Sequence, residues 1–426
     1  MPLMSSATLS LPDWLARLET LSPREIDLGL DRVDQVLERL ALPRPQNVFH
    51  VAGTNGKGSC VAMLEALLLH DKTCVGSYTS PHMIRYNERI RIDGHEASDE
   101  QIVAAFERIE ALRGGVPLTY FEYGTLAALV VFADANVDTA ILEVGMGGRL
   151  DAVNAVEPDA GIITNISLDH CDWLGGDTES IAVEKAGIMR RGKPVVFGSR
   201  KMPRTIAERA KATRARLLVA GRDYDWLHGS DGWMWSDSQQ QLEGLKRPAL
   251  PGDHQLENAA AVLAMLKAAG RHDLLDVDKV NDALAGLRLA GRMQRVEGSH
   301  RYVLDVAHNA AAAAALAAVL EAEPIDGQIV AIIGLLNDKD LSGIVSPLIG
   351  HVDHWIAATA DSPRAIESAE LARQVANLSG SACLAAESLS QALQHARSLA
   401  SPTDQILVTG SFYLVGPVLS ELYSRP

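Results

Sequence analysis

The chain has 426 residues, 47% hydrophobic and 22% charged, which is the composition of a globular protein of two or three domains. It has 39 Lys and Arg against 54 Asp and Glu, and the resulting net charge of −15 argues against a sequence-independent nucleic-acid binder. No apolar run has the length of a membrane span, and the four cysteines form no C-x-x-C pair, so we expect a cytoplasmic protein that binds neither nucleic acid nor membrane. We also expect a monomer.

The first informative segment is a glycine-rich turn, 53–59, between an apolar run at 48–51 and a helical run at 61–68. Strand, glycine-rich turn and helix in this order are typical of a phosphate-binding loop, in which Lys57 reaches the outer phosphates and the Ser59 hydroxyl faces Mg²⁺. The spacing differs from G-x-x-x-x-G-K-[ST], because only two residues separate Gly53 from Gly56. A tight turn with a solvated lysine is therefore the alternative.

Strand-like and helical runs then alternate. We expect strands at 139–142, 161–164 and 194–197, and helices at 100–112, 123–136, 179–189, 205–216 and 254–269. Ser98 and Gln101 form a candidate capping box for the first of these helices. Short apolar strands between helices predict a parallel sheet covered on both faces. Residues 221–250, rich in turn formers and tryptophan, interrupt the alternation and predict a small antiparallel segment.

A second α/β series follows residues 291–295, with strands expected at 302–306, 329–333, 355–358 and 406–409 and helices at 309–323, 365–378 and 389–399. This alternation predicts a separate doubly wound, Rossmann-like domain. We expect an α/β protein with a phosphate-loop domain over 1–290, a linker over 291–297 and a smaller C-terminal domain over 298–426.

Four segments place polar side chains at strand ends or on a helix, and they contain Ser80, Glu143, His170 and Lys185. Open parallel sheets carry their sites at the carboxyl ends of strands. Each residue has a plain alternative: a turn, a surface carboxylate, a structural histidine and a solvated lysine. Together with the glycine-rich turn they supply a hydroxyl, a carboxylate and an imidazole, which suit Mg²⁺ or Mn²⁺ bridging phosphates.

These segments resemble those of the folylpolyglutamate synthase family, within the Mur-ligase superfamily of ATP-dependent amide-bond ligases. The similar segments occur in family order along nearly the whole chain: VAGTNGKGS (51–59), TSPH (79–82), RYNERIRIDG (85–94), TYFEYGT (119–125), ILEVGMGGRLDA (141–152), LDHCDWLG (168–175), EKAGI (184–188), AGRMQ (290–294), DVAHN (305–309) and VTGSF (408–412). The segments IDLGLDRV (26–33) and TYFEYGT are most similar to the bifunctional bacterial members.

The resemblance implies a role for each matching position. It assigns ATP to Thr54, Asn55, Gly56, Lys57, Gly58, Ser59, Asn258, Arg292 and Asp305. It implies two Mg²⁺ sites, one at Ser80 and Glu143 and one at Glu143 and His170, with Lys185 as a carbamate that can also face metal. It assigns the pteroate or folate to Ile26, Asp27, Leu28, Thr119, Tyr120, Phe121, Glu122, Leu150, Asp151 and Ala152, and the incoming glutamate to His308 and Ser411.

The implied reaction is the ATP-dependent addition of L-glutamate to dihydropteroate and to reduced folates through an acyl phosphate. Lys57, Lys185, His170 and Glu143 are the implied catalytic residues. Two alternatives stay open: a Mur-type ligase acting on a cell-wall nucleotide, and a phosphate-loop NTPase switch without ligation. Segments 26–28 and 119–122 argue against the first, and the second leaves the C-terminal domain unexplained.

Overall fold

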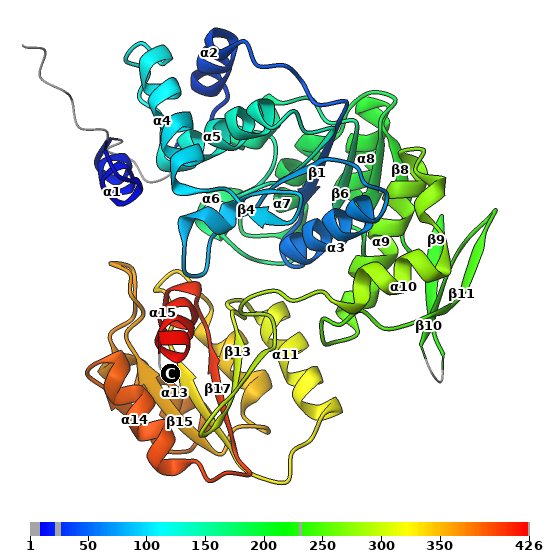
Figure 1. Cartoon of the computed structure of the whole chain (residues 1–426). Coiled ribbons are helices and arrows are strands. Elements are labelled where there is room, and N and C mark those ends of the chain that lie inside the picture. Colours follow the sequence, from blue (N-terminus) through cyan, green and yellow to red (C-terminus); the bar gives the residue numbers. More distant parts are fainter. Residues whose placement is uncertain (1–8, 22–26, 230–231, 425–426) are drawn as a thin grey trace, which may run out of the picture.

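The computed structural model describes residues 9–21, 27–229 and 232–424, which form two α/β units lying against each other (Figure 1). Within these residues the larger unit contains an eight-stranded and a three-stranded sheet, and the smaller unit contains a six-stranded sheet. Helices cover the faces of both large sheets, so the α/β class expected from the sequence is confirmed.

The first large sheet has the strand order β4-β3-β2-β5-β1-β6-β7-β8. Its strands are β1 (Asn47–Ala52), β2 (Val75–Tyr78), β3 (Ile90–Ile92), β4 (His95–Glu96), β5 (Thr139–Glu143), β6 (Ala160–Ile163), β7 (Pro194–Phe197) and β8 (Arg216–Val219). From β2 to β8 every pair of neighbours is parallel. The sequence predicted β5, β6 and β7 to within one residue, but it did not predict the antiparallel edge formed by β3 and β4.

Different helices cover the two faces of this sheet, because successive side chains of a buried strand point to opposite faces. In β1, Val48 and Ala52 belong to one hydrophobic core and Phe49 and Val51 belong to the other. The first core is closed by α1 (Leu11–Leu21), α2 (Asp31–Leu40), α4 (Asp99–Leu112) and α5 (Tyr120–Asp134), and the second by α3 (Lys57–His70), α9 (His254–Ala268) and α10 (Val277–Ala285). The remaining helices of this unit are α6 (Cys171–Leu174), α7 (Thr178–Lys185) and α8 (Arg204–Thr213).

Capping boxes define the starts of α4 and α5. The predicted box is confirmed: the Ser98 hydroxyl accepts from the Gln101 amide, and the Gln101 side chain accepts from the Ser98 amide. Thr119 and Glu122 form an equivalent box at α5. Among the described residues, none of the helices combines the length and the apolar character needed to traverse a bilayer.

The antiparallel segment expected at 221–250 is present as β9 (Tyr224–His228), β10 (Trp233–Asp237) and β11 (Gln241–Leu245). Figure 1 shows it beside α9 and α10, away from the second unit. The indole N–H of the buried Trp235 donates to the Ala260 carbonyl of α9 at 3.1 Å. This small sheet therefore extends the core under α9.

The second large sheet has the order β12-β13-β17-β14-β15-β16. Its strands are β12 (Gln294–Glu297), β13 (Arg301–Asp305), β14 (Ile329–Ile333), β15 (His354–Ala358), β16 (Cys383–Ala386) and β17 (Gln405–Thr409), and its helices are α11 (Ala310–Ala322), α12 (Leu341–Val345), α13 (Ser368–Ser379), α14 (Leu389–Leu399) and α15 (Phe412–Ser424). The sequence did not predict β12, which pairs antiparallel with β13 within the expected linker, or β16.

Candidate active site

The carboxyl ends of four neighbouring strands meet at one edge of the first large sheet. β2, β5, β1 and β6 are adjacent in that order and parallel, so the chain leaves all four at the same edge. Ser80 follows β2, Glu143 ends β5, the glycine-rich loop follows β1, and His170 follows β6. A cavity of about 1370 Å³ opens here and is lined by residues of both units.

The segment after β6 holds the glycine-rich loop in place. The Thr54 amide donates to the Asn165 carbonyl at 3.0 Å, and the Thr54 hydroxyl accepts from the Ser167 amide at 3.1 Å. The Asn55 amide donates to the Asn165 side-chain oxygen at 3.1 Å, and the Asn55 carbonyl accepts from the Thr164 hydroxyl at 2.6 Å. The protein's own hydrogen bonds therefore set the loop conformation.

Two glycines of this loop are required by close packing as well as by backbone conformation. Gly56 has a φ of 84°, and a Cβ built on it would lie 2.5 Å from Oδ1 of Asn258. Gly53 has a φ of 145°, and its Cβ would lie 1.8 Å from Oγ1 of Thr164. Because α3 begins directly after Gly56, its first N–H groups belong to Lys57, Gly58 and Ser59, and these three residues line the cavity, as in an anion site.

Two lysines converge on the loop carbonyls. Lys57 Nζ donates to the carbonyls of Gly53 and Thr54 at 3.3 and 3.2 Å, and Lys185 Nζ, from α7, donates to Gly53 at 2.8 Å. Burial, aided by the charge of Lys57, lowers the pKa of Lys185 to about 7. The Lys185 amine is therefore available in its neutral, nucleophilic form near neutral pH.

Glu143 is a buried carboxylate, 4% exposed. Its Oε2 accepts from the Ser80 amide at 3.2 Å. Burial raises the pKa of Glu143, although Lys57 and the Ser80 amide act in the opposite direction. A carboxylate whose charged form is disfavoured by burial gains strongly from a nearby cation.

His170 lies in a strained turn after β6, at the same edge of the sheet as Glu143. Its φ of 50° and ψ of 39° are left-handed, a conformation that costs a non-glycine residue about 1–3 kcal/mol and that the surrounding structure has to hold. Burial lowers the pKa of His170 to about 4, against the opposing effect of Asp169. The ring is therefore neutral at physiological pH, as a metal ligand must be.

The donors fit Mg²⁺ or Mn²⁺. Among the described residues no group of three or more His, Cys, Asp and Glu side chains is placed to hold a metal ion by itself. A site with few protein donors beside a phosphate-binding loop is one in which phosphate oxygens and water complete an octahedral shell, which is how Mg²⁺ usually binds.

The predicted ATP residues of the interdomain junction also line this cavity. Asp305, at the end of β13, accepts from the amides of Met293 and Ala307, both at 2.9 Å, and burial raises the pKa of its carboxyl group. These bonds hold the turn that carries Arg292, whose guanidinium lies 5.4 Å from the ring centroid of Phe412. Asn258, from α9, packs against Gly56 on the other side.

The described residues assigned to the pteroate form another wall of the same cavity: Asp27, Leu28, Thr119, Tyr120, Phe121, Glu122, Leu150, Asp151 and Ala152. Ile26 lies outside the described residues. The Asp151 carboxylate accepts from the Met146 and Val153 amides at 2.9 and 3.0 Å, and burial raises its pKa to about 6. The wall thus combines aromatic, apolar and acidic groups.

Arg32 of α2 holds this wall together from behind, which the sequence did not predict. Its Nε and Nη2 donate to Oε1 of the buried Glu122 at 3.1 and 2.9 Å, and its Nη1 donates to Asp27 at 3.0 Å. Because Glu122 also accepts from the Thr119 amide, Arg32 joins the 27–28 segment to the first turn of α5.

The two residues assigned to glutamate lie on the C-terminal unit. His308 Nδ1 lies 2.8 Å from the Val306 carbonyl, and its Nε2 lies 3.4 Å from Oδ2 of Asp169. The Ser411 hydroxyl accepts from the Tyr413 amide at 3.2 Å in the first turn of α15. Both line the cavity from the C-terminal unit.

All the candidate residues that the structure describes thus line one cavity, although they are spread over both units. The polar residues at this cavity that were missed as individual candidates include Arg89, Asp169 and Lys339. Asp169 and Arg89 stand inside segments that the sequence singled out, whereas Lys339 stands in no such segment, and no sequence signal pointed to it.

Comparison with protein families gives two matches. Residues 51–266 match the Mur ligase middle domain, and residues 291–412 match the glutamate ligase domain of Mur ligases. Together these matches cover more than half of the chain.

Individual relatives match along nearly the full length. The Escherichia coli dihydrofolate synthase/folylpolyglutamate synthase is 42% identical over 98% of this chain and 97% of its own. The structure of E. coli FolC in complex with DHPP and ADP matches with a TM-score of 0.90 over 98% of both chains, at 42% identity. A Yersinia pestis bifunctional enzyme complexed with AMPPNP and Mn ion matches with a TM-score of 0.89 over 98% of both chains, also at 42% identity. The chain belongs to the dihydrofolate synthase/folylpolyglutamate synthase family of Mur-type ligases.

Proposed function

We propose that this protein is an ATP-dependent ligase that adds L-glutamate to dihydropteroate, forming dihydrofolate, and to reduced folates. The observation that carries this function is one cavity that is lined by the phosphate loop, the Glu143 carboxylate, the His170 imidazole and an aromatic, acidic wall. Solved relatives with ADP, AMPPNP, Mn and DHPP support the same nucleotide, metal and substrate class.

The first step activates a carboxylate, which by itself is a poor acyl donor. An oxygen of the pteroate or folate carboxylate attacks the γ-phosphorus of ATP, and the bond from that phosphorus to the β-phosphate oxygen breaks. ADP departs, and the substrate carboxylate has become an acyl phosphate. Lys57 and the N-terminus of α3 stabilise the charge on the phosphates. Mg²⁺ held by Ser80, Glu143 and His170 would neutralise further phosphate charge when bound.

The second step forms the amide bond. The amino nitrogen of glutamate attacks the acyl carbon, loses a proton, and the C–O bond breaks with loss of inorganic phosphate. We assign His308 and Ser411 to the side from which glutamate enters, because both line the cavity from the C-terminal unit. A closed cavity protects the acyl phosphate from water.

We further assign Lys185 as a carbamate. Its neutral amine adds to CO₂, forming an N–C bond and releasing a proton. The product is an anion, so the repulsion between Lys185 and Lys57 that lowers the pKa of Lys185 becomes an attraction. The buried carbamate would then supply an anionic oxygen donor for a metal ion.

We propose residues 1–290 and 298–426 as the two functional domains, joined by residues 291–297, of which 294–297 form β12 and move with the C-terminal sheet when the domains close. We also propose a cytoplasmic monomer. Size-exclusion chromatography with light scattering tests this, because the molar mass measured for a dimer would be twice the 45.7 kDa of the chain.

The central test supplies ATP, Mg²⁺, L-glutamate and dihydropteroate and measures ADP, phosphate and glutamylated product together. The expected result is equal amounts of the three, with the same stoichiometry when a reduced folate replaces dihydropteroate. ADP release that is independent of the acceptor would indicate an NTPase switch. Turnover with a UDP-sugar peptide in place of the pteroate would indicate a cell-wall ligase.

A further inference from the structure

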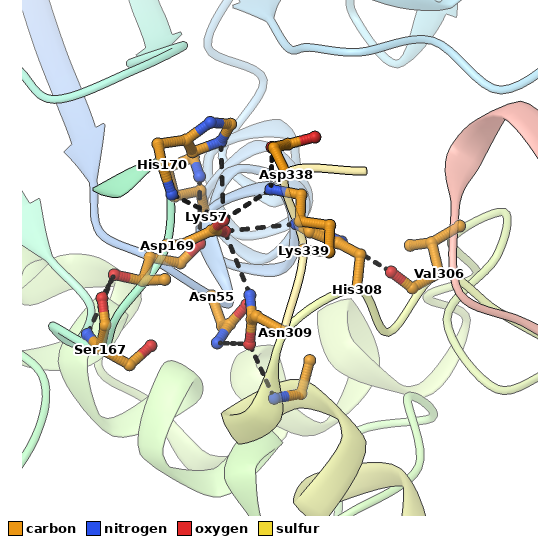
Figure 2. A network of polar contacts seen from close by, with 12 residues as sticks. Asn55, Lys57, Ser167, Asp169, His170, Val306, His308, Asn309, Asp338 and Lys339 are labelled. Carbon is orange, nitrogen blue, oxygen red and sulfur yellow. Dashed lines mark hydrogen bonds and ion pairs between the residues drawn. The ribbon is translucent and has the colours of Figure 1, made fainter. Parts of the chain in front are cut away.

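Asp169 is a contact point between the two units. It stands beside His170 in the segment after β6 and meets three side chains of the C-terminal unit (Figure 2). Lys339 Nζ lies 2.7 Å from its Oδ1, and Asn309 Nδ2 and His308 Nε2 lie 3.2 and 3.4 Å from its Oδ2. Three side chains of one unit therefore converge on a single carboxylate of the other.

A second contact lies directly beside it. Asn309 is the N-cap of α11, where its Oδ1 accepts from the Ala312 amide. The same side chain forms a reciprocal pair of amide hydrogen bonds with Asn55 of the phosphate loop, at 3.1 and 3.0 Å. The start of a C-terminal helix is thus joined to the nucleotide loop.

The burial of these groups indicates when the contacts form. The side chains of Lys339 and Asp169 are each 7% exposed, and they come from different units. When the units separate, both charges return to water, so their pairing exists only in the closed arrangement. The attraction between two buried charges offsets the cost of their desolvation only when the geometry of the pair is good. The pair therefore favours one relative orientation of the two units. Lys339 also lies 3.4 Å from Asp338 of its own unit, which orients it in advance.

The contact between Asp169 and Lys339 is joined to His170, a proposed metal ligand, by a hydrogen bond from the His170 backbone. Oδ1 of Asp169, the oxygen that accepts from Lys339, also accepts from the His170 amide at 2.9 Å. His170 occupies the left-handed turn whose conformation its surroundings have to hold. Anchoring Asp169 from the C-terminal unit thus stabilises the turn that presents the imidazole.

We propose that Asp169, Lys339, Asn309 and Asn55 form an interdomain clasp whose members are positioning residues: they fix the closed orientation of the two domains and hold His170 and the phosphate loop in register for ligation. The clasp rests on the proposed function, because ligation is the step that needs closure. None of its members has to touch the pteroate, whose wall belongs to the N-terminal unit.

The first experiment compares Lys339→Met, Asp169→Asn and the double variant with the unaltered protein. Each single variant is expected to lower kcat about 10-fold or more, as for a buried pair that loses one partner, while KM for dihydropteroate stays within about twofold. The double variant should be no slower than the slower single variant, because the two residues act through one contact. The matched control is Lys193→Met, which removes an ion pair to Asp159 at 2.8 Å within the N-terminal unit and should leave kcat unchanged.

The second readout is independent of turnover. Small-angle X-ray scattering with AMPPNP, Mg²⁺ and dihydropteroate should show compaction of the unaltered protein and of Lys193→Met, and less compaction of Lys339→Met and Asp169→Asn. Normal compaction of both clasp variants, or losses in kcat that multiply in the double variant, would overturn the clasp. An unaltered protein that compacts but forms no glutamylated product would instead contradict the proposed function.

Discussion

The two large sheets of this protein present their carboxyl edges to the same cavity, but they prepare them differently. In the N-terminal unit, the polar groups at this edge form hydrogen bonds within their own unit. The Asn165 carbonyl, for example, accepts from the Thr54 amide, and the Ser167 amide donates to the Thr54 hydroxyl. At the C-terminal edge, Lys339 and His308 reach across the interface to Asp169. One domain therefore carries the proposed phosphate site already formed, and the other completes the proposed site on docking.

This difference has a chemical reason. Phosphates need a rigid array of N–H groups before they bind, because preorganised dipoles require no rearrangement during the reaction. Glutamate and pteroate have to enter before the cavity closes, so the groups that close it must be free to separate. Substitutions at the two edges should consequently change different kinetic constants.

The largest expected effect is at the N-terminal edge. Glu143→Ala should lower kcat about 10³-fold. Of the residues proposed to bind the metal ion, Ser80, Glu143 and His170, Glu143 supplies the carboxylate, and the variant loses it. Phosphate release at saturating ATP measures the loss. The matched control is Glu65→Ala, which removes a buried carboxylate that binds Ser77 at 2.8 Å and lies apart from the cavity lining. It should lower the thermal midpoint but not kcat, and equal losses in both variants would contradict a metal role.

Lys185→Ala should lower kcat about 10²-fold, with partial rescue by formate or acetate, because a small carboxylate can replace the carbamate anion. In the unaltered protein the neutral amine is the form that adds CO₂. Because the pKa of Lys185 is about 7, this form increases as pH rises from 6 to 8. Reactivation of CO₂-depleted enzyme by bicarbonate should therefore become greater across that range. Full activity of the alanine variant without added carboxylate would remove the carbamate assignment.

Arg32→Met should raise KM for dihydropteroate about tenfold, because the wall of the cavity loses the bonds that join Asp27 to Glu122. KM for ATP should change less than about twofold. Initial-rate kinetics with each substrate varied in turn separates the two effects. Arg44→Met, which loses a surface pair to Asp159 at 2.6 Å, serves as the control and should change neither constant.

The smallest effect is expected at Ser411, in the C-terminal unit. Ser411→Ala removes the hydroxyl that caps α15, which costs about 1 kcal/mol of unfolding free energy, and should raise KM for glutamate several-fold. Ser388→Ala removes an equivalent cap, on the Gln391 amide of α14, away from the cavity. It should cost similar stability and leave KM for glutamate unchanged. If Ser411→Ala and Ser388→Ala have the same KM for glutamate, the assignment of Ser411 to the glutamate side is wrong.

Much of the fold could be predicted because its signals are local. Apolar runs such as 194–197 and 329–333 coincide with β7 and β14, and the Ser98–Gln101 box marks the start of α4. The strands β12 and β16 were missed because they are short edge strands in which two of the four residues are exposed, so neither forms a continuous apolar run. The candidate residues could be found because they stand at strand ends within segments of distinctive spacing.

The sequence by itself determined the phosphate loop, the two α/β series and the polar segments that follow their strands, since each depends on residues within a few positions of one another. Only the tertiary structure decided how these edges meet. The pairing of Lys339 with Asp169, of Asn309 with Asn55, and of Arg32 with Glu122 joins residues 90 to 254 positions apart. Such contacts depend on the packing of whole domains, which no local pattern of residue types specifies.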